Sequence, residues 1–276
     1  MKRPLKHLLL FACVALCGFV AGAAVVSYVR RPRPAESPLG RAAEAGDAAT
    51  IRGLAAAGAD VNARERGLTP LMEAARAGRV ESVGALLDAG ADPNLRDCAV
   101  NGWTPLIHAL HKHQNAAARA LVERGADVNA RAGACAADPA EGGMTALMYA
   151  AMYDNEEMVK FLLERGADPR AADGKENALT YAVGGASLGR LADIDRAATH
   201  PCPVETVRAL LASAPDLSIP HSVLNRATFY VVKMKCPEVV RLLEQRGGAP
   251  PPMHAQPAGP QTPAGEGART RTVARN

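Results

Sequence analysis

Three histidines lie close together in His108-Ala109-Leu110-His111-Lys112-His113. His108 and His111 are three positions apart, so on a helix both imidazoles would share one face, where they could bind a metal. The alternative is a polar helix face that holds no ligand. Asp193 and Asp195 are also open to two interpretations, a catalytic carboxylate pair or a solvated loop.

Beyond these two clusters we find no arrangement of residues that indicates catalysis. The sequence contains no Gly-rich phosphate loop and no HExxH zinc-protease motif. We therefore expect a protein that is not an enzyme, with no catalytic residues, no metal site and no cofactor. A small-molecule substrate is not expected either.

Basic residues gather at the two ends of the chain, so the formal net charge of +4 leaves the middle acidic, at about −4. The N-terminal cluster comprises Lys2, Arg3, Lys6, Arg30, Arg31 and Arg33, and the tail carries Arg269, Arg271 and Arg275 against Glu266. Because nucleic-acid binders carry their basic residues on the folded domain, we expect no nucleic-acid partner. The low aromatic content, 4%, favours thin layers of closely packed helices.

An uncharged apolar run extends from Leu8 to Val29. A helix of this length would measure about 33 Å, enough to cross the hydrocarbon core of a membrane. We expect residues 1–34 to form a signal anchor in the inner membrane that places the rest of the chain in the periplasm. Two alternatives remain open. The segment could be cleaved as a signal peptide near Ala21-Gly22-Ala23, or the chain could face the cytoplasm, because both flanks of the run are basic.

A string of about 30 residues occurs three times in the middle of the chain, which indicates a repeat with a period near 33 residues. Its copies are GLTPLMEAARAGRVESVGALLDAGADPNLRD from Gly67, GWTPLIHALHKHQNAAARALVERGADVNAR from Gly102 and GMTALMYAAMYDNEEMVKFLLERGADPR from Gly143. Thr69 and Thr104 are placed to cap a first helix. The apolar spacing predicts a second helix with Val83, Leu86 and Leu87 on its buried face. Gly90, Gly125 and Gly166 follow the second helix, where a left-handed residue is favoured.

The Gly-x-Thr-Pro-Leu opening, the paired Ala74 and Ala75, the Leu-Leu pair and the Gly-Ala-Asp-x-Asn exit closely resemble the ankyrin repeat. The resemblance extends from about Leu39 to Gly248. It implies an all-α solenoid of about six helix-turn-helix repeats with short hairpin connections, preceded by the N-terminal transmembrane or signal helix.

We place the ankyrin-repeat domain at residues 35–248. Its repeats are expected at about 39–64, 67–97, 102–131, 143–172, 173–219 and 220–248, and the fifth repeat carries an insertion at 184–203. Residues 249–276 are rich in Pro, Gly and Arg and lack apolar periodicity, so we interpret them as a disordered tail.

Four cysteines outside the apolar run occupy related positions. Cys98 and Cys135 follow the exits of two successive repeats, whereas Cys202 and Cys236 directly precede the second helices of two others. Because neighbouring loops can bring two Cα atoms under about 7 Å, we predict the disulfides Cys98–Cys135 and Cys202–Cys236. The alternative is four free thiols in a cytoplasmic protein.

Ankyrin-repeat proteins generally bind partners through hairpin tips and the exposed side of the first helices, which form a concave surface. Transferred position by position, this surface would comprise Arg66, Leu68, Arg76, Arg96, Trp103, His111, Lys112, Arg131, Met144, Met152 and Tyr153. Aromatic, Arg and Met residues are enriched at interfaces. Trp103 is the sharpest candidate, and the alternative is that it only packs on a neighbouring hairpin.

The resemblance therefore favours a module at the bacterial envelope that binds a protein of unknown identity as an inhibitor, an immunity protein or a scaffold. The membrane would be a second partner, through the N-terminal helix. A structural brace in a membrane assembly is the main alternative. An enzyme that uses the repeats as a scaffold is a further one.

Overall fold

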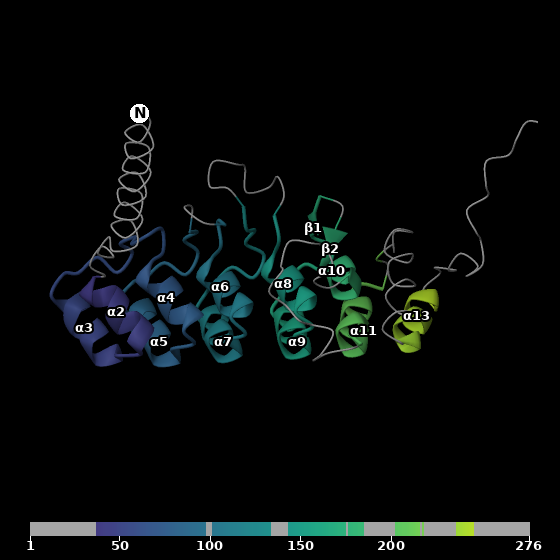
Figure 1. Cartoon of the computed structure of the whole chain (residues 1–276), viewed down its shortest axis with the longest axis horizontal. Helices are drawn as coiled ribbons and strands as arrows, with labels where there is room; N and C mark the ends of the chain where they lie inside the picture. The colour runs from purple at the N-terminus through teal and green to yellow at the C-terminus, as the bar shows by residue number, and fades with distance from the viewer. Residues whose placement is uncertain are drawn as a thin grey trace, which may run out of the picture. The chain divides into compact units, whose positions relative to one another are not determined.

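The structure is a computed structural model, and it describes residues 37–97, 101–133, 143–174, 176–184, 202–215, 217 and 236–245 (Figure 1). The proposed anchor, residues 185–201 of the proposed insertion and the proposed tail lie outside these residues. So do Cys98, Cys135, Asp193 and Asp195. The chain divides into two compact units, residues 1–141 and 142–276, which we describe separately.

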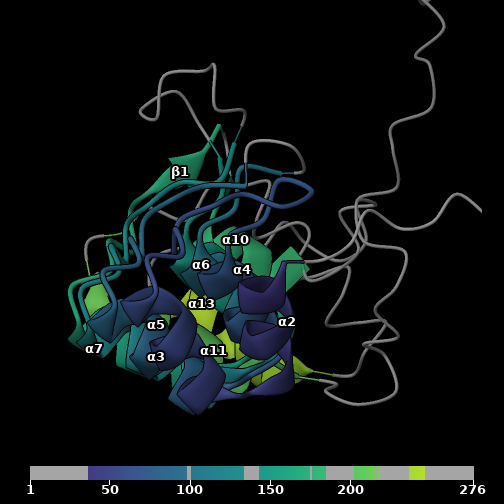
Figure 2. The ribbon, with the colours of Figure 1, turned by 90° about the vertical axis from the view of Figure 1, so that its left-hand side faces the viewer.

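The first unit contains three helix pairs: α2 (Pro38–Ala45) with α3 (Ala48–Ala56), α4 (Pro70–Arg76) with α5 (Val80–Asp88), and α6 (Pro105–His111) with α7 (Asn115–Glu123). Helices α2, α4 and α6 pack side by side in a first row, and α3, α5 and α7 form a second row alongside it, which lies lower in Figure 2. Hairpin segments connect each pair to the next. This arrangement confirms the predicted helix-turn-helix repeats for this part of the chain.

Local sequence explains where the first-row helices begin. The Thr69 hydroxyl accepts a hydrogen bond from the Met72 amide at 3.3 Å, and Pro70 occupies the first helical turn. The Thr104 hydroxyl accepts a hydrogen bond from the Ile107 amide at 3.4 Å. These caps satisfy amides that the helix itself leaves without a partner, and both were predicted.

Small side chains allow the helices to approach closely, as the sequence predicts. Ala74, Ala75, Val83 and Leu86 are completely buried, but Leu87 is only partly buried. Gly90, Gly125 and Gly166 end the second helices with φ of 89°, 95° and 85°. Since these values are in the left-handed region, the predicted role of the three glycines is confirmed.

The hairpins of the first unit are joined by asparagine side chains. Asn62 Oδ1 accepts a hydrogen bond from the Asp92 amide at 2.9 Å, and Asn94 Oδ1 accepts one from the Asp127 amide at 2.8 Å. Each asparagine thus links its own hairpin to the next one. The fourth repeat has Arg170 at this position.

The second unit contains α8 (Ala146–Met152) and α9 (Glu156–Glu164), followed by α10 (Ala178–Gly184), α11 (Val204–Ser213) and α13 (Pro237–Glu244). Helices α8 and α10 pack together, and α11 packs against α9, α10 and α13. A two-residue strand pair, β1 (Ala172–Asp173) and β2 (Glu176–Asn177), forms the hairpin before α10 and is a small exception to the all-α architecture. The fifth repeat therefore has both of its helices, whereas α13 is the described helix of the sixth.

Every residue of α8 and of α10 is buried. Hydrogen bonds connect these helices to the segments around them. Tyr181 of α10 donates to Asp173 of β1 at 3.2 Å, and Thr206 of α11 donates to Asp154, which follows α8, at 2.7 Å. Within the described residues no helix is long and apolar enough to span a membrane.

Candidate partner-binding site

Asp97, at the end of the second repeat, is the centre of a polar cluster that extends into the third. Its side chain is completely buried, and Oδ1 accepts hydrogen bonds from the amides of Asn101 at 3.0 Å and Trp103 at 2.9 Å. The Asp97 amide donates to the Trp103 carbonyl at 3.0 Å. Asp97 thus closes the loop before α6 and fixes the backbone of Trp103.

Asp97 also contacts α6. Its Oδ2 lies 2.7 Å from His108 Nε2, and the His108 side chain is only 5% exposed. Burial lowers the pKa of His108 to about 4, against the opposing effect of the Asp97 carboxylate. The 2.7 Å contact joins the loop to the helix, and because His108 is neutral at neutral pH it does so without a buried cation.

Trp103 lies against two histidines of α6. Its ring centroid is 5.3 Å from that of His108 in an edge-on arrangement and 4.7 Å from that of His111. The indole is half-buried. Both of these ring contacts are with its own repeat.

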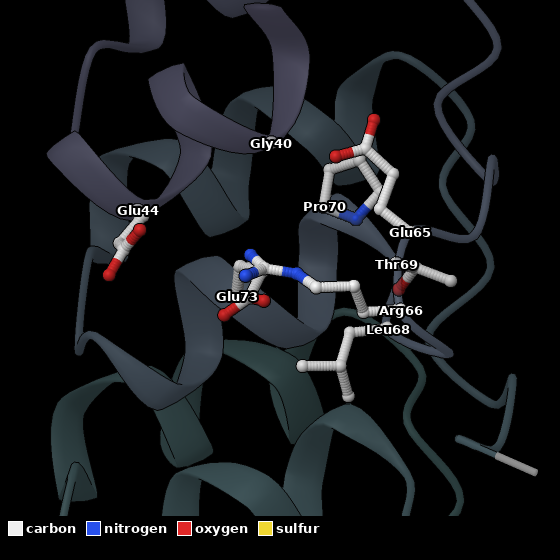
Figure 3. A pocket seen from close by; sticks show the side chains of 8 residues that line it. All are labelled: Gly40, Glu44, Glu65, Arg66, Leu68, Thr69, Pro70 and Glu73. Atoms are coloured by element: carbon white, nitrogen blue, oxygen red, sulfur yellow. The ribbon is translucent and has the colours of Figure 1, made fainter. Parts of the chain in front are cut away.

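A shallow hollow lies between α2, α4 and the hairpin that precedes α4 (Figure 3). It is lined by Gly40, Glu44, Glu65, Arg66, Leu68, Thr69, Pro70 and Glu73. Arg66 has a left-handed backbone with φ of 52°, and its side chain extends toward Glu73 (Figure 3). Glu65 accepts two hydrogen bonds from the Ser37 amide, at 3.0 and 2.8 Å, and hydrogen bonding by Ser37 lowers the pKa of Glu65.

The predicted contact residues fall into three groups by exposure. Arg66 and Lys112 are exposed, and the half-buried group comprises Arg76, Arg96, Trp103, His111, Arg131 and Met144. Leu68, Met152 and Tyr153 are 8%, 4% and 7% exposed. We expected these last three on the open side of the repeats, and that expectation is wrong. Leu68 pairs with Glu65 in an isolated antiparallel bridge, and Tyr153 stacks on Tyr149 with ring centroids 6.5 Å apart.

His108 is in contact with Asp97, and no cluster of three or more potential metal ligands occurs among the described residues.

The two predicted disulfides differ in what the structure shows of them. Cys202 and Cys236 form a disulfide in the structure, and the Cys98–Cys135 bridge stays a prediction.

Sequence reasoning missed the role of Asp97. A signal was present, because Arg64-Glu65 and Arg96-Asp97 place an acidic residue at the same hairpin position. It also missed a Gly-x-Ser-x-Gly spacing at 185–189, which lies outside the described residues. That motif indicates a nucleophile when a strand leads into it. Here α10 ends directly before it, so the required context is absent.

These layers of paired helices and short hairpins define a helical repeat protein. The profile "Ankyrin repeats (3 copies)" matches residues 27–97, 96–173 and 133–190, which together exceed half of the chain. The chain therefore belongs to the ankyrin-repeat family, whose members are typically protein-binding modules rather than enzymes. No curated protein matches the chain. Beyond residue 190 the repeat assignment rests on α11 and α13.

Proposed function

We propose that this chain binds a protein partner through the surface around Trp103, which we call the Trp103 surface: Arg76, Arg96, Trp103, His111 and Lys112. The observation that carries the proposal is the fixed position of Trp103. Asp97 holds its backbone and two histidines support its ring, yet the indole stays partly accessible. A large side chain held in place before binding loses little conformational entropy in a complex.

The charges near Trp103 favour an acidic partner segment. Lys112 is exposed, and the Arg76 side chain is 37% exposed while it lies 3.5 Å from Glu73. Arg64 donates to the Arg96 carbonyl, which brings a further cation to the same hairpins. Asp97, the acidic residue that binds the Trp103 amide, is buried. We therefore expect carboxylates beside an apolar side chain on the partner.

A photo-crosslinking amino acid at Lys112 tests this proposal. Lys112 is exposed next to His111, whereas Glu81 is exposed on α5 in the second row and provides a matched control. In the native cell, the crosslinker at position 112 should yield a discrete protein adduct that is missing from position 81. Adducts only from position 81, or none from either, would contradict the proposal.

We further propose that residues 1–34 hold the repeats at a bacterial inner membrane, with the repeats in the periplasm, where binding would serve an inhibitor, immunity or scaffold role. The uncharged run from Leu8 to Val29 supports this location. The Cys202–Cys236 bridge adds support, because disulfides persist in oxidising compartments.

Protease treatment of intact cells and of spheroplasts, followed by detection of a C-terminal tag, tests the location. The tagged chain should resist alkaline extraction from membranes and become accessible to protease only in spheroplasts. A chain that stays soluble, or that is cut only after the inner membrane is opened, would contradict it.

A further inference from the structure

The Cys202–Cys236 disulfide joins the beginnings of two neighbouring helices. Cys202 lies just before α11, and Cys236 is the residue that precedes α13. Their Cα atoms are 5.6 Å apart, a separation typical of disulfides, and the bond closes a loop of 34 positions. The bond therefore connects the fifth repeat to the described helix of the sixth.

Few other described contacts hold α13. The helix has eight residues, of which Val239 and Leu243 are buried, and α11 is the described helix on which it packs. The ion pair between Arg208 and Glu238, at 3.0 Å, is about half-exposed on both sides and contributes little. Because an isolated helix of this length is unstable in water, α13 depends on its attachment to α11, and among the described contacts the disulfide is the covalent one.

We propose that this disulfide is a redox-controlled attachment: its reduction releases α13 from α11 while the earlier repeats stay folded. The proposal goes beyond partner binding and does not depend on it. A fixed α13 would complete the end of the array, whereas a released α13 would leave the outer side of α11 uncovered. The chain would then respond to a dithiol reductant at its C-terminal repeat.

The two sulfur atoms differ in access. Cys202 is half-buried, whereas Cys236 is 4% exposed. A thiolate of the dithiol would therefore attack Cys202 Sγ, and Cys236 would leave as a thiolate and take up a proton. The second thiol of the reductant then attacks the mixed disulfide and displaces the Cys202 thiolate, which is protonated in turn. Two electrons and two protons pass to the protein, and the reductant becomes a cyclic disulfide.

Hydrogen exchange measured by mass spectrometry on the chain, with and without dithiothreitol, tests the proposal. Closing a loop of 34 positions restrains the opened state, so reduction should speed amide exchange in residues 237–244 on the order of 100-fold. Exchange in α4 to α7 should not change. The double variant Cys202→Ser/Cys236→Ser should match the reduced protein in both buffers, which separates this bond from any effect of the other cysteines.

Alkylation mapped to the peptides of Cys202 and Cys236 verifies the redox state. Unchanged exchange of α13 in protein shown to be reduced would overturn the proposal. Two alkylatable thiols at these positions in oxidised protein would also overturn it, and so would equal acceleration in every repeat, since the effect would then not be local.

Discussion

His108 Nε2 lies 2.7 Å from Asp97 Oδ2, and both side chains are almost completely excluded from water. This contact joins the loop that carries Trp103 to the helix that supports the Trp103 ring. The His108–Asp97 contact is therefore the structural basis of the Trp103 surface.

Asp97→Ala should destabilise the first unit by about 3 kcal/mol, because it leaves the Asn101 and Trp103 amides without their acceptor and opens a space beside the buried His108 ring. Glu65→Ala is the matched control, since Glu65 occupies the same position in the preceding hairpin but is only half-buried. We expect it to cost about 1 kcal/mol. Urea unfolding followed by Trp103 fluorescence measures both. Equal losses would show that Asp97 has no special role.

Stability should decrease as the pH falls from about 6.5 toward 4. Burial lowers the pKa of His108 to about 4, below its ordinary value of 6.5. The folded state therefore binds a proton at His108 less readily than the unfolded state does. The resulting contribution to the free energy of unfolding is complete above the unfolded pKa of 6.5 and is lost as the pH falls toward 4. The loss should approach about 3 kcal/mol at most.

The charged groups acting on His108 are Asp97, Arg76 and His111. His108→Gln cannot titrate at this position, so its free energy of unfolding should change less between pH 7 and pH 5. A wild type with the same pH dependence as the variant would contradict the lowered pKa. The lowered pKa of Glu65 contributes only at more acidic pH, where carboxylates become protonated.

Gly102 is predicted to tolerate no side chain. It has φ of 66°, and an added Cβ would lie 1.6 Å from the Gly133 carbonyl oxygen. Gly102→Ala should cost about 3 kcal/mol or more. Gly58 also has a left-handed backbone, with φ of 89°, but an added Cβ would meet open space. Gly58→Ala should therefore cost only about 1 kcal/mol.

Gly84 provides a third comparison, because it is inside α5 with no atom within 4 Å of an added Cβ. Gly84→Ala should stabilise the chain by about 0.5–1 kcal/mol. Thermal unfolding of the three variants gives the order of their stabilities directly. If Gly102→Ala were no worse than Gly58→Ala, the close approach of the two hairpin segments would be wrong.

The asparagine links between hairpins are expected to contribute modestly. Asn94→Ala removes the acceptor of the Asp127 amide and should cost about 1 kcal/mol. Asn94→Asp retains an acceptor oxygen at the same place and should lose less. Chemical denaturation distinguishes the two variants, and identical losses would mean that the hydrogen bond is not the cause.

The regular part of the fold was predictable because each signal is local. Thr69 caps its own helix, and Gly90 ends one, so a pattern repeated in register gives both the helices and their order. Asp97 could not be assigned in this way. Its partners Trp103 and His108 come from a loop and from the next helix, and only the folded chain brings them together.

The predicted contact surface fails at particular positions for a similar reason. Met152 and Tyr153 match exposed positions of the family pattern, yet every residue of α8 is buried. The corresponding helix in the second repeat, α4, has Glu73 and Arg76, which are half-buried and lie 3.5 Å apart as an ion pair. Periodicity shows which side of a helix faces away from its partner helix, but it does not show whether that side is covered.

The measurement that tests the central claim most directly is the affinity of the partner captured through position 112 for the wild-type chain and for Trp103→Ala. Arg52→Ala, an exposed change on α3, is the control, and unfolding midpoints verify that each variant is folded. We predict that Trp103→Ala weakens the Kd by roughly 30-fold or more, which corresponds to about 2 kcal/mol, while Arg52→Ala has no effect. An unchanged Kd for folded Trp103→Ala would contradict the claim that this chain binds its partner through the Trp103 surface.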